Sequence, residues 1–383
     1  MPVMSKIFCN FAPKFYDIMD LEKSFQSSYD LLKAVILIPS VTRDEEAVAD
    51  FLQDYLMKAS GEPVRRHINN LWQVAPGYDG KRPTLLLNAH CDTVRPVDSW
   101  KHEPFTPIEE NGCLYGLGSN DDGASLVTLL HTYLALRDVP QSYNLVFAIS
   151  AEEEVSGKNG LESILPLMPQ IDVALVGEPT GMRGAVAEKG LVVLDGTAHG
   201  KAGHAARGEG INALYIALDA IAKLRDYTFP KESATLGPVR ITTTQIQAGT
   251  AHNVVPDVCT FVTDVRTTDA YSNQQVVEIL RQLVAPVELK ARSTRLEPSS
   301  IAESHPLVRK AASLGISFFG SPTLSDQSLM RWPSLKMGPG DSARSHTADE
   351  FIRKEEIRDA LRIYWQLLNG LNLQKPSNRE IVQ

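Results

Sequence analysis

Short runs of consecutive apolar residues alternate along the chain with longer segments whose apolar positions recur at helical spacing. Three runs are apolar almost throughout, which is typical of strands buried on both faces: TLLLN (84–88), NLVFAIS (144–150) and DVALV (172–176). The segment GASLVTLLHTYLALRD (123–138), between the first two runs, predicts a buried helix. Because strands alternate with helices, we expect an α/β sheet, in which ligands gather where the strands end.

Two further helices are expected before these strands. The segment EEAVADFLQDYLMKA (45–59) carries apolar residues at helical spacing. An earlier helix is expected around Leu31 to Ile38, and Pro39 would stop it because proline cannot continue a helix.

The pattern changes after about residue 185. Three segments alternate apolar and polar residues in the manner of half-exposed strands: GLVVLDGTAHG (190–200), ITTTQIQAG (241–249) and CTFVTDVRTT (259–268). Two helices are expected among them, at 211–226 and 272–285. Two helices on one antiparallel sheet form a small α+β domain. We therefore predict a larger domain made of 1–184 and 298–383, with 1–20 as an N-terminal extension, and an inserted domain of 185–297.

The bulk composition excludes several classes of function. A chain of 383 residues is too long for one core, which favours two domains. Its net charge of −8 argues against nucleic acid or an anionic membrane surface as the main partner. No stretch reaches the roughly 20 apolar residues that span a bilayer, and polar residues interrupt any signal-peptide core. Four cysteines, at positions 9, 91, 113 and 259, show no paired spacing, which favours a reducing cytoplasm.

Candidate chemistry follows directly after the predicted strands. His90 and Asp92 share one face of the extended chain after TLLLN, and a carboxylate beside an imidazole fixes the tautomer of a ligating histidine. In YGLGSNDDG (115–123), Asp121 stands where a phosphate-binding G-x-G-x-x-G loop needs its third glycine, so the turn offers carboxylates instead. Taken alone, the first pair is more often structural, and the second is equally well explained as a solvated turn.

Three adjacent glutamates, Glu152 to Glu154, follow the apolar run NLVFAIS. Two unit charges about 4 Å apart repel by roughly 4 kcal/mol at an effective dielectric near 20, so we expect the triplet to face metal ions. The alternative is a solvated run of surface charges. Glu178 follows the third strand and precedes Pro179, and His346 follows a loop rich in glycine and serine. Alone, each of these two is more often structural, but the order and spacing of all the elements are far more specific.

These motifs resemble those of the two-zinc amidohydrolases and metallopeptidases that include acetylornithine deacetylase, succinyl-diaminopimelate desuccinylase, aminoacylase and several di- and tripeptidases. The resemblance runs from about residue 25 to 370, and the wording of GEPT, AEKG, GKAGHAA, HNVVPD and SPTLSDQ is most similar to that of acetylornithine deacetylases. It rests on five motifs: His90-x-Asp92, Gly116-x-Gly118-x-x-Asp121-Asp122, Glu153-Glu154, Gly177-Glu178-Pro179-Thr180 and Ser345-His346-Thr347.

The resemblance implies a role for each residue. His90 and Glu178 would hold one zinc ion, Glu154 and His346 would hold a second, and Asp121 would be shared between the two. Cobalt or manganese could replace zinc. Glu153 matches the general base, and Asp92 matches the carboxylate that supports His90. In the inserted domain, His204 resembles a histidine that reaches the reacting carbonyl across a dimer. Asn253 resembles a polar partner of the substrate, and Arg266 resembles an arginine that binds the substrate carboxylate.

The fold and activity implied are equally specific. We expect a zinc-exopeptidase-like catalytic domain, whose mainly parallel or mixed sheet is flanked by helices, with an inserted ferredoxin-like lid and dimerisation domain in a homodimer. The implied activity is metal-dependent hydrolysis of the amide bond of an N-acyl amino acid, with N-acetylornithine as the first candidate, a step of arginine biosynthesis. Alternatives with the same chemistry are N-acetyl- or N-succinylcitrulline, succinyl-diaminopimelate or a dipeptide.

Two features set limits on the resemblance. Many relatives carry lysine where this chain has Gly123, so any role of that lysine is not transferred. A cis peptide bond is expected between Asp121 and Asp122, as in relatives. From other classes of function, a dinucleotide-dependent dehydrogenase would explain the Gly-x-Gly turn but not its missing third glycine. A non-catalytic metal-binding protein would explain the ligands but not the presence of Glu153.

Overall fold

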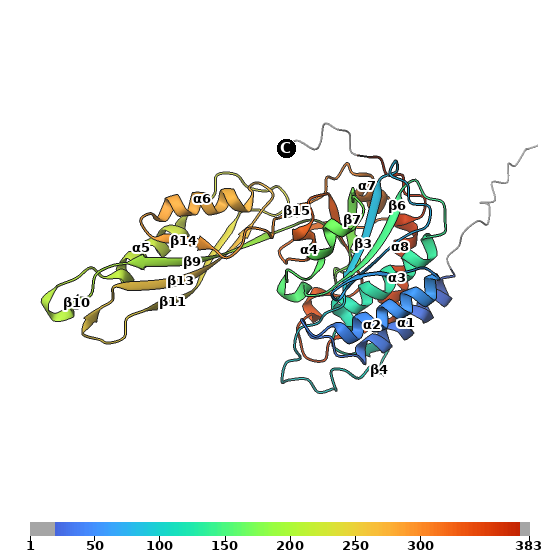
Figure 1. Cartoon of the computed structure of the whole chain (residues 1–383), viewed down its shortest axis with the longest axis horizontal. Helices are drawn as coiled ribbons and strands as arrows, with labels where there is room; N and C mark the ends of the chain where they lie inside the picture. Colours follow the sequence, from blue (N-terminus) through green and yellow to red (C-terminus); the bar gives the residue numbers. More distant parts are fainter. Residues whose placement is uncertain (1–19, 376–383) are drawn as a thin grey trace, which may run out of the picture.

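The computed structural model describes residues 20–375, which form two bodies joined by extended connections (Figure 1). The larger body contains both ends of this range, and the inserted domain projects from it to one side (Figure 1). The predicted N-terminal extension, 1–20, lies outside the described residues except for Asp20. Within residues 20–375, no helix combines the length and the apolar character that a membrane crossing needs.

A nine-stranded mixed sheet forms the centre of the larger domain. The three runs predicted as buried strands are β3 (Thr84–His90), β6 (Asn144–Ser150) and β7 (Val173–Val176), and they lie parallel in the order β6-β3-β7. β17 (Ser334–Lys336) continues the parallel part beside β7. The other strands are β1 (Arg65–His67), β2 (Asn70–Val74), β8 (Gly184–Glu188), β15 (Ser299–Ser300) and β16 (Phe318–Ser321).

Helices bury both faces of this sheet, as the apolar runs predicted. In β3, Leu85 and Leu87 belong to one apolar cluster, and Leu86 belongs to the cluster on the opposite face. Full burial of each such side chain contributes about 1.5–3 kcal/mol. The first face is covered by α1 (Leu21–Ile36), α2 (Glu46–Ser60), α3 (Ala124–Leu136), α7 (Pro306–Ser313) and α8 (Lys354–Leu368), and α4 (Leu161–Ile164) packs on the second.

Helix α1 begins earlier than the sequence pattern predicted. The side chain of Asp20 accepts a hydrogen bond from the backbone N–H of Lys23 at 3.0 Å and so caps the helix. The helix ends at Ile36, before Pro39, as expected. Beside it lies a small antiparallel sheet that the sequence did not predict, made of β4 (Ile108–Glu110), β5 (Cys113–Tyr115) and β18 (Phe351–Arg353).

The inserted domain has its own four-stranded antiparallel sheet, with strand order β11-β13-β9-β14. Along the chain its main elements are β9 (Gly190–His199), α5 (Ala213–Asp226), β11 (Arg240–Ala248), β13 (Val258–Thr267), α6 (Asn273–Val284) and β14 (Glu288–Ala291). This succession and strand order is the split βαβ arrangement of ferredoxin-like folds. Strand β14 was not predicted, because it is only four residues long and Leu289 is its one fully buried residue.

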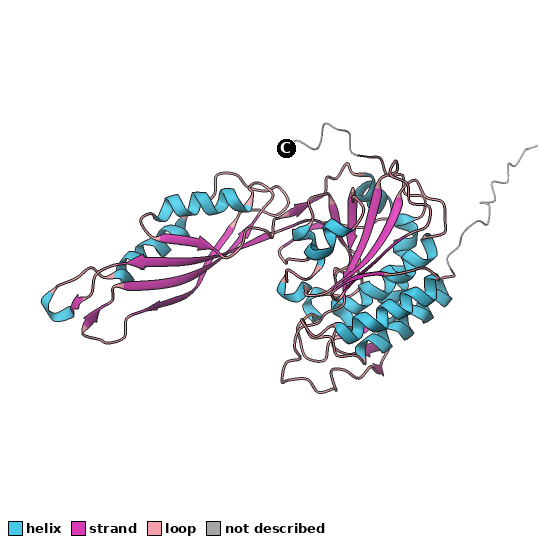
Figure 2. Cartoon of the chain, viewed as in Figure 1, coloured by secondary structure: helices cyan, strands magenta, loops and turns pink. Residues whose placement is uncertain are grey.

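One face of the inserted sheet is covered and the other is open. The buried positions of β9, among them Val192 and Leu194, pack in one cluster with residues of both α5 and α6. The residues that alternate with them are only partly buried. Figure 2 shows both helices against this sheet and, at its far end, the short strands β10 (Gly203–His204) and β12 (Val254–Val255). The near end is the root of the domain, where β8 runs into β9 and β15 returns beside β8.

Candidate metal centre

Four of the predicted functional residues lie at one edge of the large sheet, where its parallel strands end. His90 is the last residue of β3, and Glu153 and Glu154 form a short turn, Glu153–Val155, just after β6. Glu178 follows β7 after a single glycine. Because parallel strands present their carboxyl ends at the same edge, the topology of the sheet brings these side chains together.

Asp121 and His346 complete the group from two loops. Asp121 Oδ1 lies 3.2 Å from His90 Nε2, and Asp121 Oδ2 lies 3.7 Å from His346 Nε2. His346 Nε2 also lies 3.0 Å from Glu154 Oε2. The two imidazoles therefore approach different oxygens of one carboxylate, as a carboxylate shared between two metal ions requires. The peptide bond between Asp121 and Asp122 is cis, which confirms that expectation.

Two sets of side chains offer ligand atoms at distances that suit a metal ion. The atoms of His90, Asp121 and Glu154 all lie within 4.8 Å of one another, and so do those of His90, Glu153 and Glu178. Zinc accepts both imidazole nitrogen and carboxylate oxygen. Glu153 lies in the second set, so distance alone does not distinguish a ligand from a general base at this position.

The surroundings of two carboxylates of this group, Glu153 and Glu178, disfavour their ionised forms. Burial raises the pKa of Glu153 well above its ordinary value, and the neighbouring charges of Glu178 and Asp326 add to this effect against that of His90. Burial, followed by the charge of Asp121, likewise raises the pKa of Glu178 well above its ordinary value. Divalent cations in the centre would remove this penalty and keep the carboxylates ionised.

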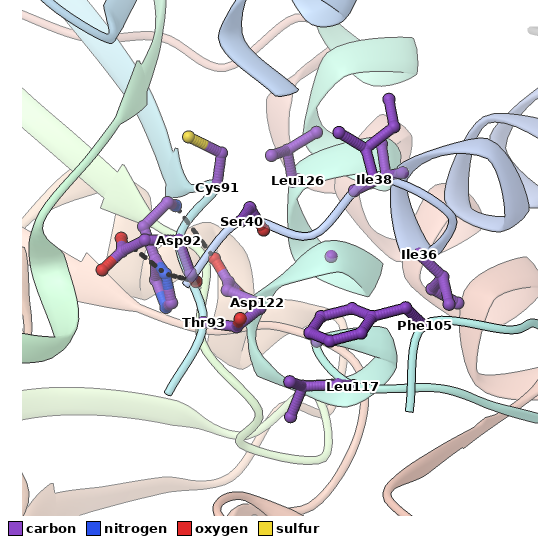
Figure 3. Close-up of a pocket in the computed structure, with 14 residues that line it drawn as sticks. Ile36, Ile38, Ser40, Cys91, Asp92, Thr93, Phe105, Leu117, Asp122 and Leu126 are labelled. Atoms are coloured by element: carbon purple, nitrogen blue, oxygen red, sulfur yellow. Dashed lines mark hydrogen bonds and ion pairs between the residues drawn. The ribbon is translucent and has the colours of Figure 1, made fainter. Parts of the chain in front are cut away.

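A cavity of about 490 Å³ opens over the centre and is large enough for a small substrate. Its walls include Asp121, Glu153, Glu154, Glu178, His346, Thr180, Phe319, Ser321, Thr323 and Lys336. A second space, of about 10 Å³, lies on the inner side of the centre, next to Asp92 and the apolar side chains of Phe105, Leu117 and Leu126 (Figure 3).

Asp92 holds the glutamate pair in place. Its carboxylate accepts hydrogen bonds from the backbone N–H groups of Glu153, at 3.0 Å, and Glu154, at 3.2 Å, and from Thr42 Oγ1 at 2.8 Å. Asp92 Oδ1 also lies 3.4 Å from His90 Nδ1, which is 2.9 Å from the carbonyl oxygen of Asp92. One buried carboxylate therefore orients residues from two different strands.

Glu350 holds Asp121 through its backbone in a similar way, and the sequence analysis did not predict this role. This buried carboxylate accepts hydrogen bonds from the backbone N–H groups of Gly118 at 3.1 Å, Asn120 at 2.7 Å and Asp121 at 2.9 Å. Burial, followed by the charge of Asp121, raises the pKa of Glu350 to about 8. Glu350 precedes the short strand β18, which was not predicted, so its burial left no periodic signal.

Glu152 does not face the centre, and the expectation that all three glutamates do so is wrong. Its backbone adopts a positive φ of 53°, which turns the side chain away. The carboxylate accepts a hydrogen bond from Asn159 Nδ2 at 3.0 Å instead. An isolated αL residue reverses the direction of the chain, so neighbours in sequence need not share a face.

Lys336 and Asp326 are further charged residues at the centre that the sequence analysis missed. Lys336 Nζ lies 2.6 Å from Glu188 Oε2, and both side chains are almost completely buried. Asp326 accepts a hydrogen bond from Ser150 Oγ at 2.5 Å, and burial raises its pKa to about 6. A lysine inside the short strand SLK has no feature in sequence that distinguishes it from an exposed residue, and Asp326 lies in the motif SPTLSDQ, which was noted for its resemblance but not for a charged residue at the centre.

The three residues predicted in the inserted domain do not line the cavity. His204 belongs to β10, which pairs with β12, and Asn253 precedes β12; both lie at the far end of the inserted domain (Figure 1). Arg266 belongs to β13, where its Nε lies 2.9 Å from Asp264 Oδ1. Within one copy of the chain, the described structure therefore assembles the metal centre but leaves these three apart from it.

Comparisons with known proteins agree with this geometry. Residues 86–370 match the model of peptidase family M20/M25/M40. The chain is 27% identical over 386 aligned positions to an acetylornithine deacetylase of Shigella sonnei, which covers 89% of this chain and 96% of the relative.

Solved structures show the same fold. A tripeptidase of Staphylococcus aureus superposes with a TM-score of 0.73 at 20% identity, over 90% of this chain and 97% of that one. A peptidase of Bacillus subtilis that is described as dinuclear metal-binding superposes with a TM-score of 0.70 at 16% identity, over 91% of this chain and 98% of that one.

Replacing Glu350 tests the support of Asp121. The Glu350 carboxylate accepts hydrogen bonds from three backbone N–H groups, and in Glu350→Gln the side-chain N–H₂ would face at least one of these donors. We therefore expect the affinity for zinc to fall by about tenfold to a hundredfold. Competition with a fluorescent zinc chelator measures this. Glu355→Gln, which removes an exposed charge from the first turn of α8, is the matched control and should bind zinc as the unmodified protein does. Equal affinity of all three proteins would contradict the assigned role.

Proposed function

The chain belongs to peptidase family M20/M25/M40, and from this premise we propose that it hydrolyses the amide bond of an N-acyl amino acid, most directly N-acetylornithine. One observation carries the proposal: His90 and His346 approach separate oxygens of Asp121 at the floor of a cavity that Glu153 also lines. The products of the proposed reaction are acetate and ornithine, which assigns the protein to arginine biosynthesis.

The side chains present fit two zinc ions. His90 and Glu178 would hold one ion, Glu154 and His346 the other, and Asp121 would be shared. The raised pKa values of Glu153 and Glu178 and the separate approaches to Asp121 support this assignment. When bound, such ions polarise the acyl carbonyl and make water more acidic. Cobalt or manganese accept the same donor set.

Glu153 is the residue that we assign to proton transfer. Its pKa lies well above the ordinary value, chiefly because it is buried, so it can hold a proton between two steps. It takes a proton from the attacking water and then delivers that proton to the nitrogen of the leaving amine. Asp92 positions Glu153 through the hydrogen bond to its backbone N–H. The amide is thereby split into a carboxylate and an amine.

The inserted domain would supply the remaining contacts. Arg266 carries the guanidinium that we assign to the α-carboxylate of the substrate, because its planar fork matches a carboxylate. His204 and Asn253 lie together at the far end of the domain, where the backbone N–H of Ala205 donates to the carbonyl of Asn253 at 3.0 Å. That position favours contact with the cavity of a second copy of the chain, with His204 placed at the acyl oxygen.

A homodimer through the inserted domain is therefore part of the proposal. On α5 and the segment before it, Ile211, Tyr215 and Leu218 are exposed, and the Tyr215 residue is 65% exposed. Strand β11 is an edge of the sheet and carries the exposed Ile246. An apolar patch beside an unpaired strand edge favours pairing with another copy. Such a dimer would extend the two sheets into one.

The choice of substrate separates the main proposal from its alternatives. The acetylornithine deacetylase relative supports N-acetylornithine, whereas the tripeptidase among the structural neighbours favours a peptide as the second candidate. N-acetyl- or N-succinylcitrulline and succinyl-diaminopimelate use the same chemistry.

None of the described cysteines, Cys91, Cys113 and Cys259, forms a disulfide, which supports a cytoplasmic location.

Turnover of N-acetylornithine by the zinc-loaded protein tests the function, with ornithine release as the measurement. We expect Glu153→Gln to lose at least about a hundredfold in kcat, because an amide cannot carry the proton, while zinc content is unchanged. Glu152→Gln is the matched control, since that side chain faces away, and it should remain active. The role of Glu153 is refuted if its variant keeps full activity. A panel of citrulline, succinylated and dipeptide substrates identifies the substrate if N-acetylornithine is not hydrolysed.

The proposed dimer is tested by placing a charged residue at the centre of its apolar contact surface. Tyr215→Asp should shift the protein from dimer to monomer in size-exclusion chromatography with light scattering, because it buries a charge in an apolar contact. Met57→Asp, at an exposed apolar residue of α2 in the larger domain, should leave the dimer intact. A monomeric unmodified protein, or a Tyr215→Asp variant that stays dimeric, would contradict this surface.

A further inference from the structure

A buried ion pair in the wall of the metal cavity takes part in none of the proposed chemical steps. Lys336, the last residue of β17, lines the cavity although it is only 2% exposed. Its Nζ lies 2.6 Å from Oε2 of Glu188, the last residue of β8, which is completely buried. Because both charges lose their hydration, a buried ion pair is not in itself an advantage for stability. Its place in the cavity wall therefore points to a role in function.

Both partners of the ion pair hold the same loop, residues 321–325. Lys336 Nζ donates to the carbonyl oxygen and to Oγ1 of Thr323, at 3.3 Å each. Glu188 accepts hydrogen bonds from the backbone N–H of Ser325 at 2.9 Å and from Ser325 Oγ at 2.7 Å. An ammonium group has three donors, and Glu188 and Thr323 supply three acceptors for them. No donor of Lys336 is left for a substrate.

The loop has few other hydrogen bonds that could fix it. Within the described part of the chain, residues 322–324 form no backbone–backbone hydrogen bond. The other side-chain hydrogen bonds of Thr323 are local and go to Ser321 Oγ, two residues away. The ion pair is therefore the link that ties the loop to strands β17 and β8.

The same loop forms one wall of the metal cavity. Four consecutive residues, 321–324, line the cavity together with Glu153 and Glu178. Lys336 pairs in register with Val176 of β7, and Glu178 follows Val176 by two residues. The ion pair thus anchors the loop to the part of the sheet that carries the metal centre. A substrate that fills the cavity meets both the loop and the metal centre, because both line it.

We propose that Lys336 is a positioning residue for substrate binding, which holds the loop 321–325 in place so that this wall of the cavity is formed before the substrate arrives. The inference rests on the proposed function, in which the N-acyl amino acid binds in this cavity. A wall that is already ordered spares the substrate the entropic cost of ordering it. Since Lys336 has no donor free for the reacting atoms, its contribution is to binding and not to the chemical step.

The test removes both charges together. Lys336→Met alone would leave Glu188 as an unpaired buried charge, so the variant is Lys336→Met/Glu188→Gln, in which neutral side chains of similar volume replace the pair. On the zinc-loaded protein we expect KM for N-acetylornithine to rise about tenfold and kcat to change by less than about twofold, because the loop must then be ordered on binding. Zinc content should be unchanged.

The matched control removes another ion pair of the larger domain. Lys33 and Glu109 are 2.8 Å apart, and neither lines the cavity. Lys33→Met/Glu109→Gln should leave KM and kcat as they are in the unmodified protein. A fall in kcat at constant KM in the Lys336→Met/Glu188→Gln variant would overturn the proposal, and so would an equal rise of KM in the control.

Hydrogen–deuterium exchange separates this inference from the proposed hydrolysis. In the variant Lys336→Met/Glu188→Gln, we expect the backbone amides of residues 323–325 to exchange at least about tenfold faster than in the unmodified protein. The amides of the glutamate turn, residues 151–156, should exchange at the same rate in both. If N-acetylornithine is not hydrolysed, faster exchange in the loop still supports the role of Lys336. Unchanged exchange at residues 323–325 refutes that role and leaves the hydrolase proposal standing.

Discussion

The repulsion among carboxylates buried at one edge of the large sheet is the constraint on which the rest of the structure depends. Glu153, Glu154, Glu178 and Asp121 are held close together by strand ends and a tight turn, and burial raises the pKa of two of them well above the ordinary value. A folded chain keeps such a group only if cations offset the charge or protons neutralise it. The approach of two imidazoles to opposite oxygens of Asp121 favours the first solution.

The candidate ligands are positioned by carboxylates that do not themselves line the cavity. Asp92 accepts hydrogen bonds from the N–H groups of the glutamate turn, and Glu350 accepts them from the turn that carries Asp121. Glu350 holds backbone N–H groups, and Asp92 holds backbone N–H groups and also lies 3.4 Å from the imidazole of His90, so the geometry of the centre is built into the larger domain. In the described structure, these hydrogen bonds involve no residue of the inserted domain. Its conformation can therefore change without disturbing the side chains of the candidate metal centre.

The sequence predicted those features that leave a repeated or local signal. Fully apolar runs predicted β3, β6 and β7, and the residues that follow them predicted His90, Glu154 and Glu178 as neighbours. Asp121 and His346 were noted in the sequence, but their roles as metal ligands came from the resemblance, because the turn and the loop that carry them have no periodic pattern. The residues that the sequence analysis missed are those whose role depends on burial. Glu350, Lys336 and Asp326 are buried by segments that are distant in the sequence, and this burial is not visible in the sequence around each residue. Glu152 was assigned wrongly, since a single positive φ separated it from its neighbours.

The central claim is that two metal ions, bridged by Asp121, hold this anionic edge together. It is tested most directly by a crystal structure of the zinc-loaded protein with anomalous diffraction measured at the zinc edge. We expect two anomalous peaks, each about 2.0–2.2 Å from a different oxygen of Asp121, with His90 and Glu178 at one and Glu154 and His346 at the other. A single peak, or peaks that Asp121 does not contact, would contradict the account.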